Sequence, residues 1–298
     1  MQFVTGGPGP DVAEPDGPAA AEIRTAIEAA GGAIPFEEFV RIALYGAAGF
    51  YTRTTPTPSA GPASSSDSAS STGRAGRRGD FITSPEIGPL FGAVVARFLD
   101  AEWRRLGEPD PFVVVDGGAG PGTLARAVLA ASPQCHEAGA MRYVAVELSA
   151  AQRSQHPDGI ISVSELDEVT TAVGASRPTG SFDGVVIANE LLDNLPFRLA
   201  VFDSAWREAF VVARADGTFA EVLSAPFDPV PSVLPGRPVH GARAPLHDVA
   251  ARWVEAARSM VSSGTVVCLD YTSPITAALA TRPYRDWLRT YRGHERGD

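Results

Sequence analysis

The sequence contains no lysine, so its 25 basic side chains are all arginines, against 35 acidic side chains. The net charge of −10 argues against nucleic acid as a partner, because nucleic-acid-binding proteins usually present a basic face. An acidic surface either maintains solubility or favours a basic partner, such as a protein that presents arginine. Arginine without lysine, together with abundant alanine, glycine and proline, is typical of a GC-rich bacterial genome.

Cysteine is nearly absent as well, since only Cys135 and Cys268 occur. Two cysteines this far apart form neither a disulfide framework nor a zinc site, and both are predicted to be small buried apolar residues. The five histidines show no metal-ligand spacing, so no metal is expected and no chemistry is assigned to them. We therefore expect a protein of the reducing cytoplasm.

Long apolar runs are missing too: none approaches the ~20 residues that a membrane helix needs, so no membrane partner is expected. Residues 1–18 lack the basic and apolar regions of a signal peptide, and their glycine and proline content predicts disorder. Residues 54–78 are mostly serine, threonine, proline, alanine and glycine. Such a segment buries little apolar surface, so a flexible loop is expected there. The sequence does not predict an oligomeric state.

The rest of the chain has two parts. Residues 19–107 are predicted to form a helical cap, with helices at 19–30, from Pro35 onward, and from Ser84 to Gly107. Residues 108–298 alternate between apolar strands and helices, which indicates a parallel sheet covered on both faces. The expected strands span residues 112–116, 143–147, 160–163, 184–188 and 265–270, with a helix at 247–261. An antiparallel insertion of short strands is expected at about 197–244.

A glycine-rich turn follows the first of these strands and precedes a helix. Residues 113–123 read Val-Val-Val-Asp-Gly-Gly-Ala-Gly-Pro-Gly-Thr, and glycine allows both a sharp turn and the close approach of a ligand. The first N–H groups of the following helix would attract an anionic group. The acid-x-Gly-x-Gly-x-Gly pattern of S-adenosylmethionine (SAM) sites is matched completely by Asp116, Gly118, Gly120 and Gly122.

A dinucleotide site is the alternative for this turn. Its G-x-G-x-x-G pattern requires a third glycine, but this chain has Thr123 there if the pattern starts at Gly118, and Ala125 if it starts at Gly120. Alanine occurs at this position in some dinucleotide sites, so Ala125 is only a partial mismatch. Glu147 ends the second strand, where an acid can accept both ribose hydroxyls in either class of site. We interpret Glu147, with Leu148 beside it, as cofactor-binding. The alternative for Glu147 is an exposed strand-end carboxylate.

Polar residues also follow the fourth strand. In an open α/β sheet this strand lies beside the first, so its carboxyl end faces the same crevice. Asn189 is predicted to lie there against the cofactor, and Glu190 and Asp193 against the transferred group and its acceptor. The alternative is that Glu190 and Asp193 are helix N-terminal acids that balance the helix dipole.

Several segments together resemble one family. The runs Ile-Pro-Phe-Glu-Glu-Phe at 34–39, Ala-Leu-Tyr at 43–45, Gly-Phe-Tyr at 49–51 and Gly-Asp-Phe-Ile-Thr-Ser-Pro-Glu-Ile at 79–87 are similar to those of the MidA-like family. The stretches 118–122, 189–196 and 269–271 match it in the same order, so the resemblance covers most of residues 20–298. The run at 79–87 is the most specific, whereas the glycine turn alone is shared by many methyltransferases.

The resemblance implies a class I SAM-dependent methyltransferase, with a Rossmann-like α/β sheet, an N-terminal helical cap and an inserted antiparallel region. The family includes a mitochondrial complex I assembly factor that methylates a protein arginine, so the resemblance implies a protein substrate. It also implies that residues 79–86 help to close the SAM pocket, through Asp80, Thr83, Pro85 and Glu86. By motif position, Glu165 and Leu166 would lie near the adenine.

The chain departs from the family pattern in places. The loop at 54–78 is longer than expected, and the first-strand acid is Asp116 where relatives often have glutamate. The run Tyr-Arg-Gly-His at 291–294 is internal in relatives, where a further segment supplies the last strands. We therefore interpret the chain as truncated, with an exposed sheet edge that favours instability or aggregation.

Methyl transfer is an in-line displacement at the sulfonium carbon, and most of its rate comes from positioning. An arginine guanidinium holds its proton strongly, so Glu190 and Asp193 are predicted to orient it and disperse its charge. A SAM-binding assembly factor with little or no activity is one alternative, favoured by the truncation. An NAD-dependent oxidoreductase is another, and the imperfect dinucleotide pattern and the run at 79–87 argue against it.

Overall fold

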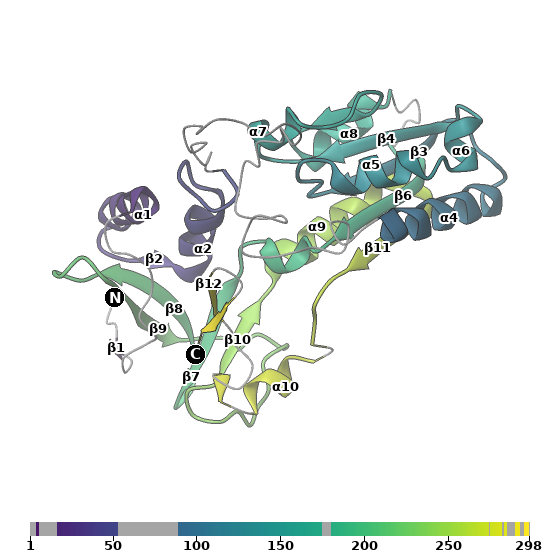
Figure 1. Ribbon diagram of the computed structural model, residues 1–298. Helices are drawn as coiled ribbons and strands as arrows, with labels where there is room; N and C mark the ends of the chain where they lie inside the picture. Colours follow the sequence, from purple (N-terminus) through teal and green to yellow (C-terminus); the bar gives the residue numbers. More distant parts are fainter. Residues whose placement is uncertain are drawn as a thin grey trace, which may run out of the picture. The chain divides into compact units, whose positions relative to one another are not determined.

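The computed structural model describes residues 4–5, 17–52, 89–174, 180–273, 275–281, 283–284, 290–292 and 295–297. These residues belong to two compact units (Figure 1). The parallel-sheet unit is built from the described parts of Thr54–Asn194 and Ala251–Tyr271. The antiparallel-sheet unit is built from those of Met1–Arg53, Leu195–Ala250 and Thr272–Asp298.

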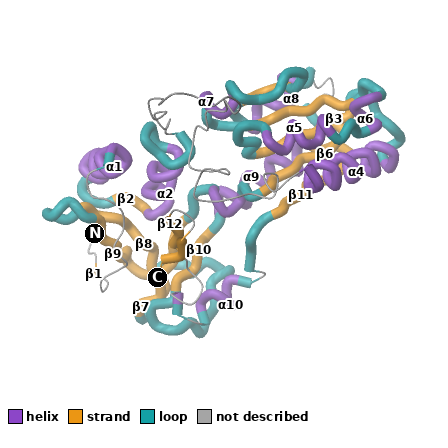
Figure 2. Tube along the Cα trace, viewed as in Figure 1, coloured by secondary structure: helices purple, strands orange, loops and turns teal. Residues whose placement is uncertain are grey.

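The parallel-sheet unit has five parallel strands in the order β11-β6-β3-β4-β5. Figure 2 labels three of them, β11, β6 and β3. Their bounds are Val261–Leu269 (β11), Phe182–Asn189 (β6), Phe112–Gly117 (β3), Met141–Val146 (β4) and Ile161–Val163 (β5). After β3 the chain adds β4 and β5 on one side, then β6 and β11 on the other. Ligand crevices of open α/β sheets form at the carboxyl ends of the strands, where the strand order reverses in this way.

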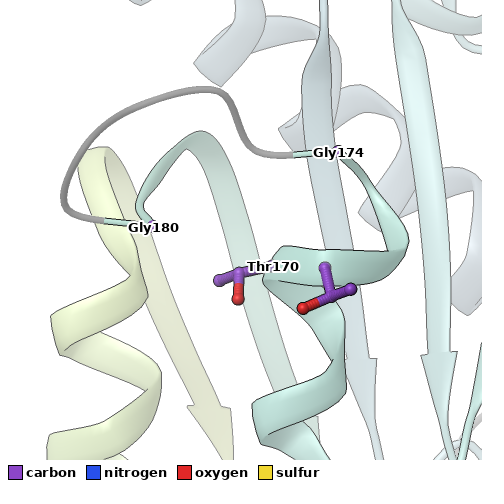
Figure 3. Close-up of a pocket in the computed structure, with 4 residues that line it drawn as sticks. Thr170, Gly174 and Gly180 are labelled. Atoms are coloured by element: carbon purple, nitrogen blue, oxygen red, sulfur yellow. The ribbon is translucent and has the colours of Figure 1, made fainter.

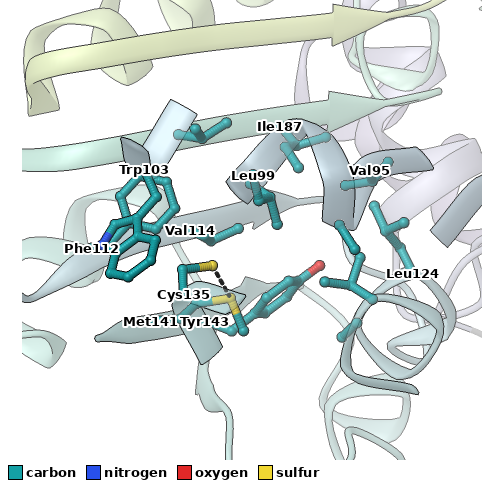
Figure 4. Packing of buried hydrophobic residues seen from close by; sticks show 14 of the residues in the cluster. Val95, Leu99, Trp103, Phe112, Val114, Leu124, Cys135, Met141, Tyr143 and Ile187 are labelled. Carbon is teal, nitrogen blue, oxygen red and sulfur yellow. Dashed lines mark hydrogen bonds between the residues drawn. The ribbon is translucent and has the colours of Figure 1, made fainter. Parts of the chain in front are cut away.

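Helices cover both faces of this sheet because alternate side chains of β3 point in opposite directions. Phe112 and Val114 pack against α4 (Pro89–Arg105), α5 (Thr123–Ala130) and α6 (Gln134–Glu137), in the cluster drawn in Figure 4. Val113 and Val115 pack on the other face, with α8 (Val169–Ala172) and α9 (Asp248–Met260). The short helix α7 (Ala150–Arg153) follows β4. The glycine turn thus begins from a strand that is buried along its whole length.

The antiparallel-sheet unit has the strand order β1-β9-β8-β7-β10, and β2 pairs with β8. The bounds are Val4–Thr5 (β1), Phe219–Pro226 (β9), Ala205–Ala213 (β8), Arg198–Asp203 (β7), Arg243–Leu246 (β10) and Ile34–Pro35 (β2). α1 (Pro18–Ala29) and α2 (Phe36–Tyr45) pack their isoleucines against Val211 of β8. A second cluster, around Trp206, includes α10 (Thr276–Ala280). The strands β12 (Thr290–Arg292) and β13 (Glu295–Gly297) form a separate two-stranded sheet.

The structure confirms the predicted α/β class, with a parallel sheet and an antiparallel insertion. The predicted helical cap, residues 19–107, is divided between the two units. α1 and α2 bury their apolar side chains on the antiparallel sheet, whereas α4 buries its own on the parallel sheet. The predicted loop at 54–78 and the predicted helix start at Ser84 lie outside the described residues.

Short strands account for the other differences. Val4 and Thr5 lie in the segment predicted to be disordered, yet they pair with β9 as strand β1. The sequence pattern does not predict β10, because this strand is short and contains Pro245. β10 ends the strand order and pairs only with β7 among the described strands, and an edge position tolerates proline.

The two cysteines differ in burial. Cys135 is buried in the cluster of Figure 4, with its Sγ 3.9 Å from Sδ of Met141, as predicted. Cys268 is exposed, so the prediction of a buried side chain was wrong there. The reason is that, among the described strands, β11 pairs with β6 alone, and much of β11 is exposed or half-buried.

None of the helices that the structure describes is both long enough and apolar enough to cross a membrane. Within the same residues, no group of three or more His, Cys, Asp and Glu side chains is placed to hold a metal ion.

Candidate functional site

Charged and polar residues follow the strands of the parallel sheet along its carboxyl edge. In strand order these are Asp270 after β11, Asn189 and Glu190 at the end of β6, the turn 117–122 after β3, Glu147 after β4 and Glu165 after β5. Neighbouring strands lie about 5 Å apart, so the ends of β4 and β6 are separated by roughly 10 Å. The edge therefore suits an elongated ligand that crosses the end of β3.

The glycine turn has a backbone that other residues would strain. Gly118, Gly120 and Gly122 have φ angles of +68°, +55° and +80°, in the left-handed region that favours glycine. A Cβ atom at Gly118 would also lie 2.8 Å from Cδ1 of Leu191. The glycine pattern of the sequence thus follows from the path of the turn.

Residues that follow β4 contact both the backbone N–H and the backbone carbonyl oxygen of Gly120. Its N–H donates to Oε2 of Glu147 at 3.0 Å, and its carbonyl oxygen lies 2.9 Å from Nε2 of His156. Nδ1 of His156 lies 2.9 Å from Oγ of Ser162 in β5. Burial lowers the pKa of His156, which favours the neutral ring, and a tautomer that donates from Nε2 satisfies both contacts. Sequence spacing assigned no role to His156, whereas the structure places it against the turn.

Glu147 lies at the end of β4, as predicted, and is partly buried. Its other oxygen, Oε1, accepts the N–H of Ser149 at 2.8 Å. Burial raises the pKa of Glu147, and the N–H groups of Ser149 and Gly120 act in the opposite direction. Each carboxylate oxygen has two lone pairs, so Glu147 can accept ligand hydroxyls while it holds the turn. The neighbouring Leu148 is 49% exposed and offers apolar surface beside it.

Asp116 lies beneath the turn. It is 3% exposed, and its Oδ2 accepts a hydrogen bond from the hydroxyl of Tyr143 at 2.9 Å. Burial raises the pKa of Asp116 to about 7; the Tyr143 hydrogen bond opposes this shift, and the charge of Glu147 adds to it. At this depth Asp116 supports the turn and presents almost no surface to solvent.

Asp116→Asn is expected to remove a loss of stability that occurs as pH rises. The folded-state pKa of about 7 exceeds the ordinary 3.8, so the folded protein binds this proton more tightly than the unfolded chain. The wild-type free energy of unfolding therefore falls between about pH 4 and pH 7. When urea unfolding is measured at pH 5 and at pH 8, the free energy of unfolding of wild type should fall by about 1–3 kcal/mol more than that of the variant.

The matched control for that experiment is Asp110→Asn, an exposed aspartate just before β3. A difference between wild type and Asp116→Asn that stays constant with pH would show that Asp116 is ionised throughout, and the raised pKa would be wrong.

Glu190 and Asp193 lie in the tight turn that follows β6. Glu190 has a φ of +50°, which is uncommon for glutamate, and its N–H donates to the carbonyl oxygen of Leu269 at 2.8 Å. Asp193 is exposed in the short 3-10 helix η2 (Leu192–Asn194). Desolvation of its carboxyl, then the charges of Asp270 and Glu190, raise the pKa of Asp193 to about 6. Asp193 is therefore mostly ionised at neutral pH.

A third acid lies at the start of the short helix that contains Asp193. In the alternative interpretation, Glu190 and Asp193 balance the N-terminal N–H groups of a helix. In the structure, Asp270 accepts those N–H groups, because its Oδ2 lies 2.7 Å from N of Leu192 and 3.4 Å from N of Asp193. Asp270 thus caps η2, and Asp193 is itself an acid in the first turn of η2, where a negative charge favours the helix dipole.

The sequence interpretation missed Asp270 and Tyr143. Asp270 follows β11 at its carboxyl end, so the rule that identified Glu147 after β4 would also have found it. Tyr143 carries no such signal. Its partner Asp116 is 27 residues away, and only the pairing of β3 with β4 brings the two together.

The other predicted cofactor residues follow β5 or belong to the segment 79–86. Glu165 is exposed at the start of η1 (Leu166–Glu168), and Leu166 is half-buried against the face covered by α8. Four more lie outside the described residues, namely Asp80, Thr83, Pro85 and Glu86.

A hollow elsewhere on this unit does not belong to the site. It is lined by Thr170, Thr171, Gly174 and Gly180 (Figure 3). This segment leads from α8 to Phe182, at the amino end of β6. The hollow therefore lies at the opposite edge of the sheet from the glycine turn.

Known methyltransferases are similar to this chain in sequence. The chain is 35% identical over 198 residues to the mitochondrial protein arginine methyltransferase NDUFAF7 homolog of Drosophila melanogaster, covering 56% of this chain and 43% of the relative. It is 43% identical over 54 residues to the human protein arginine methyltransferase NDUFAF7, covering 18% and 12% respectively. The chain thus spans less than half the length of these curated relatives.

Solved structures are also similar. A COG1565 superfamily member from Burkholderia thailandensis, bound to S-adenosyl-homocysteine, aligns with a TM-score of 0.70 at 25% identity over 99% of this chain and 73% of the other. A native crystal structure of a COG1565 superfamily protein from the same organism aligns with a TM-score of 0.62 at 26% identity, over 91% and 65%.

The family comparison decides between the two ligand classes that the glycine pattern left open. The model of the family Methyltransf_28, whose members are described as S-adenosyl-L-methionine-dependent methyltransferases, matches residues 94–298. The ligand of the first similar structure agrees with SAM rather than a dinucleotide. Because this match covers more than half of the chain, the protein belongs to this family of SAM-dependent methyltransferases.

Proposed function

We propose that the carboxyl edge of the parallel sheet binds SAM, with the turn 117–122 around its methionine part and Glu147 on its ribose hydroxyls. The observation that carries this proposal is the hydrogen bond from the Gly120 N–H to Glu147 Oε2 at 3.0 Å. That bond places a left-handed glycine backbone next to a carboxylate with spare lone pairs. A helix N-terminus follows the turn, and its N-cap Gly122 has no side chain to occupy the site of an anion.

The adenine would lie on the β5 side of Glu147. Leu148 supplies exposed apolar surface there, and Glu165 and Leu166 follow the next strand of the sheet. Asn189 would contact the cofactor from the end of β6, the strand on the other side of β3. The segment with Asp80, Thr83, Pro85 and Glu86 remains a predicted closure of the same pocket.

We further propose that the acceptor is a protein side chain, most simply arginine. The relatives from Drosophila and human are named protein arginine methyltransferases, which supports this choice. When bound, SAM would supply an electrophilic methyl group to the acceptor nitrogen, which would lose one proton to water, and S-adenosyl-homocysteine would be the leaving group. Glu190 and Asp193 would hold the cationic guanidinium, because ionised carboxylates accept strong hydrogen bonds from it. Both residues follow β6, the neighbour of β3, and in the proposed SAM orientation they would lie near its methyl end.

Radiolabelled SAM tests this function when it is mixed with the purified protein and a lysate of cells that lack it. We expect label in protein, and mass spectrometry should find it on a side-chain nitrogen. Label that stays in SAM while SAM still binds would indicate a SAM-binding factor without activity. That outcome would overturn the transferase proposal.

His156→Ala should loosen the glycine turn. The variant loses the contact between Nε2 and the Gly120 carbonyl oxygen, and a hydrogen bond of this kind contributes about 1 kcal/mol. We expect the dissociation constant for SAM to rise about 5- to 10-fold, measured by calorimetry. His136→Ala, at an exposed position in α6, is the control. Equal SAM affinity in both variants would mean that the turn keeps its shape without His156.

A further inference from the structure

We propose that Asp270 is a positioning residue for methyl transfer, which fixes the turn that carries Glu190 and Asp193 to the end of β11. The inference rests on the proposed function, which assigns Glu190 and Asp193 to the methyl acceptor. Asp270 acts through backbone N–H groups and through its charge, without touching SAM or the acceptor.

Both carboxylate oxygens of Asp270 accept backbone hydrogen bonds. Oδ2 lies 2.7 Å from N of Leu192 and 3.4 Å from N of Asp193, and Oδ1 accepts the N–H of Tyr271 at 2.8 Å. The contact with Leu192 joins residues that are 78 positions apart, so it is a tertiary contact and not a local cap. Hydrogen bonds to an ionised acceptor are stronger than neutral ones, so this contact restrains the turn effectively.

Strand β11 holds the same turn at a second point. The N–H of Glu190 donates to the carbonyl oxygen of Leu269 at 2.8 Å, and Leu269 is the ladder partner of Asn189. Consecutive residues of the chain, Leu269 and Asp270, therefore bind the turn at Glu190 and at Leu192. The φ of +50° at Glu190 calls for such restraint, because a non-glycine residue keeps this conformation only when its surroundings impose it.

Asp270 also shapes the electrostatics of Asp193. The charged groups that bear on the Asp193 carboxyl are Asp270 from the end of β11 and Glu190 from its own turn, while Nδ2 of Asn194 donates to its Oδ1 at 3.0 Å. Desolvation is the largest cause of the raised pKa of Asp193, and the Asp270 charge is the next. Removing that charge should therefore lower the pKa of Asp193.

Asp270→Asn tests both effects, because it keeps the side-chain shape and one acceptor oxygen but removes the charge. We expect hydrogen exchange at the amides of Leu192 and Asp193 to become about tenfold faster. The Asp193 carboxyl carbon, followed by NMR, should titrate at lower pH than in wild type. The acid limb of kcat/KM, which the raised pKa of Asp193 predicts near pH 6 in wild type, should move to lower pH, with SAM affinity within about threefold of wild type.

Asp270→Ala removes the acceptor entirely, and kcat should fall about 100-fold at unchanged SAM affinity. Asp110→Asn, at an exposed position before β3, should behave as wild type in every measurement. A merely structural Asp270 would lower Tm without moving the titration of Asp193.

The two proposals can fail separately. Unchanged amide exchange and unchanged Asp193 titration in Asp270→Asn would overturn the positioning role, whether or not the protein transfers methyl groups. If those changes appear in a protein that transfers no methyl group, the positioning of the turn stands and the proposed function is the part that fails.

Discussion

Glu147→Gln is expected to weaken SAM binding by about 100-fold or more. The carboxylate of Glu147 would accept the ribose hydroxyls, and hydrogen bonds to a charged acceptor contribute about 1.5–3 kcal/mol each. The same group holds the Gly120 N–H, so the substitution also loosens the turn around the methionine part. Calorimetry with SAM and with S-adenosyl-homocysteine should show similar losses, because both ligands share the ribose.

The matched control is Glu137→Gln, at an exposed glutamate of α6. It removes the same charge just before the amino end of β4, at the opposite edge of the sheet from the turn, and it should leave the affinity unchanged. An affinity in Glu147→Gln within threefold of wild type would place the sugar elsewhere and would make Glu147 a structural tie for the turn.

The double variant Glu190→Gln, Asp193→Asn is expected to lower kcat by about 1000-fold or more while SAM binds nearly as in wild type. Both amides keep the shape of the turn but lose the charge that would hold a guanidinium, and misplacement of a reacting group is costly in rate. The measurements are the initial rate of label transfer and the calorimetric affinity for SAM.

A double variant with matched chemistry, Glu137→Gln with Asp110→Asn, controls for the change in net charge. Retained activity in Glu190→Gln, Asp193→Asn would remove these acids from the reaction. Loss of SAM binding would instead reassign them to the cofactor, and transfer would then need another group to hold the acceptor.

Because Asp193 titrates in this turn, we expect wild-type activity to increase as pH rises. Asp193 has a pKa raised to about 6, so it gains its charge as pH rises through that value. If the charge holds the acceptor, kcat/KM should increase between about pH 5 and pH 7 and then level off.

Much of the parallel sheet could be predicted because its signals are local. The run Val113–Val114–Val115 is apolar throughout, as a central strand covered on both faces requires, and a glycine turn and a helix follow it directly. Glu147 was found by the same logic, since its place depends only on where β4 ends. Each of these features is set within about ten residues of sequence.

The contacts that hold the site together could not be predicted, because they join distant parts of the chain. His156 meets Gly120 across 36 residues, and Asp270 meets Leu192 across 78. Nothing near His156 in the sequence distinguishes it from an ordinary surface histidine. Only the pairing of β3, β4, β6 and β11 brings these groups together.

The prediction that Cys268 is buried was wrong for a similar reason. An apolar strand pattern does not say whether a strand lies at the centre of a sheet or at its edge, and β11 has a partner on one side only in the described part of the chain. The apolar stripes of α1 and α4 likewise do not specify which sheet each helix covers.

Calorimetric titration of the folded wild-type protein with SAM, S-adenosyl-homocysteine and NADH tests most directly whether the glycine turn and Glu147 bind SAM. We expect SAM and S-adenosyl-homocysteine each to bind at one site per chain, without competition from NADH. Absence of binding by both sulfur nucleosides, or binding of NADH at the same site, would contradict it.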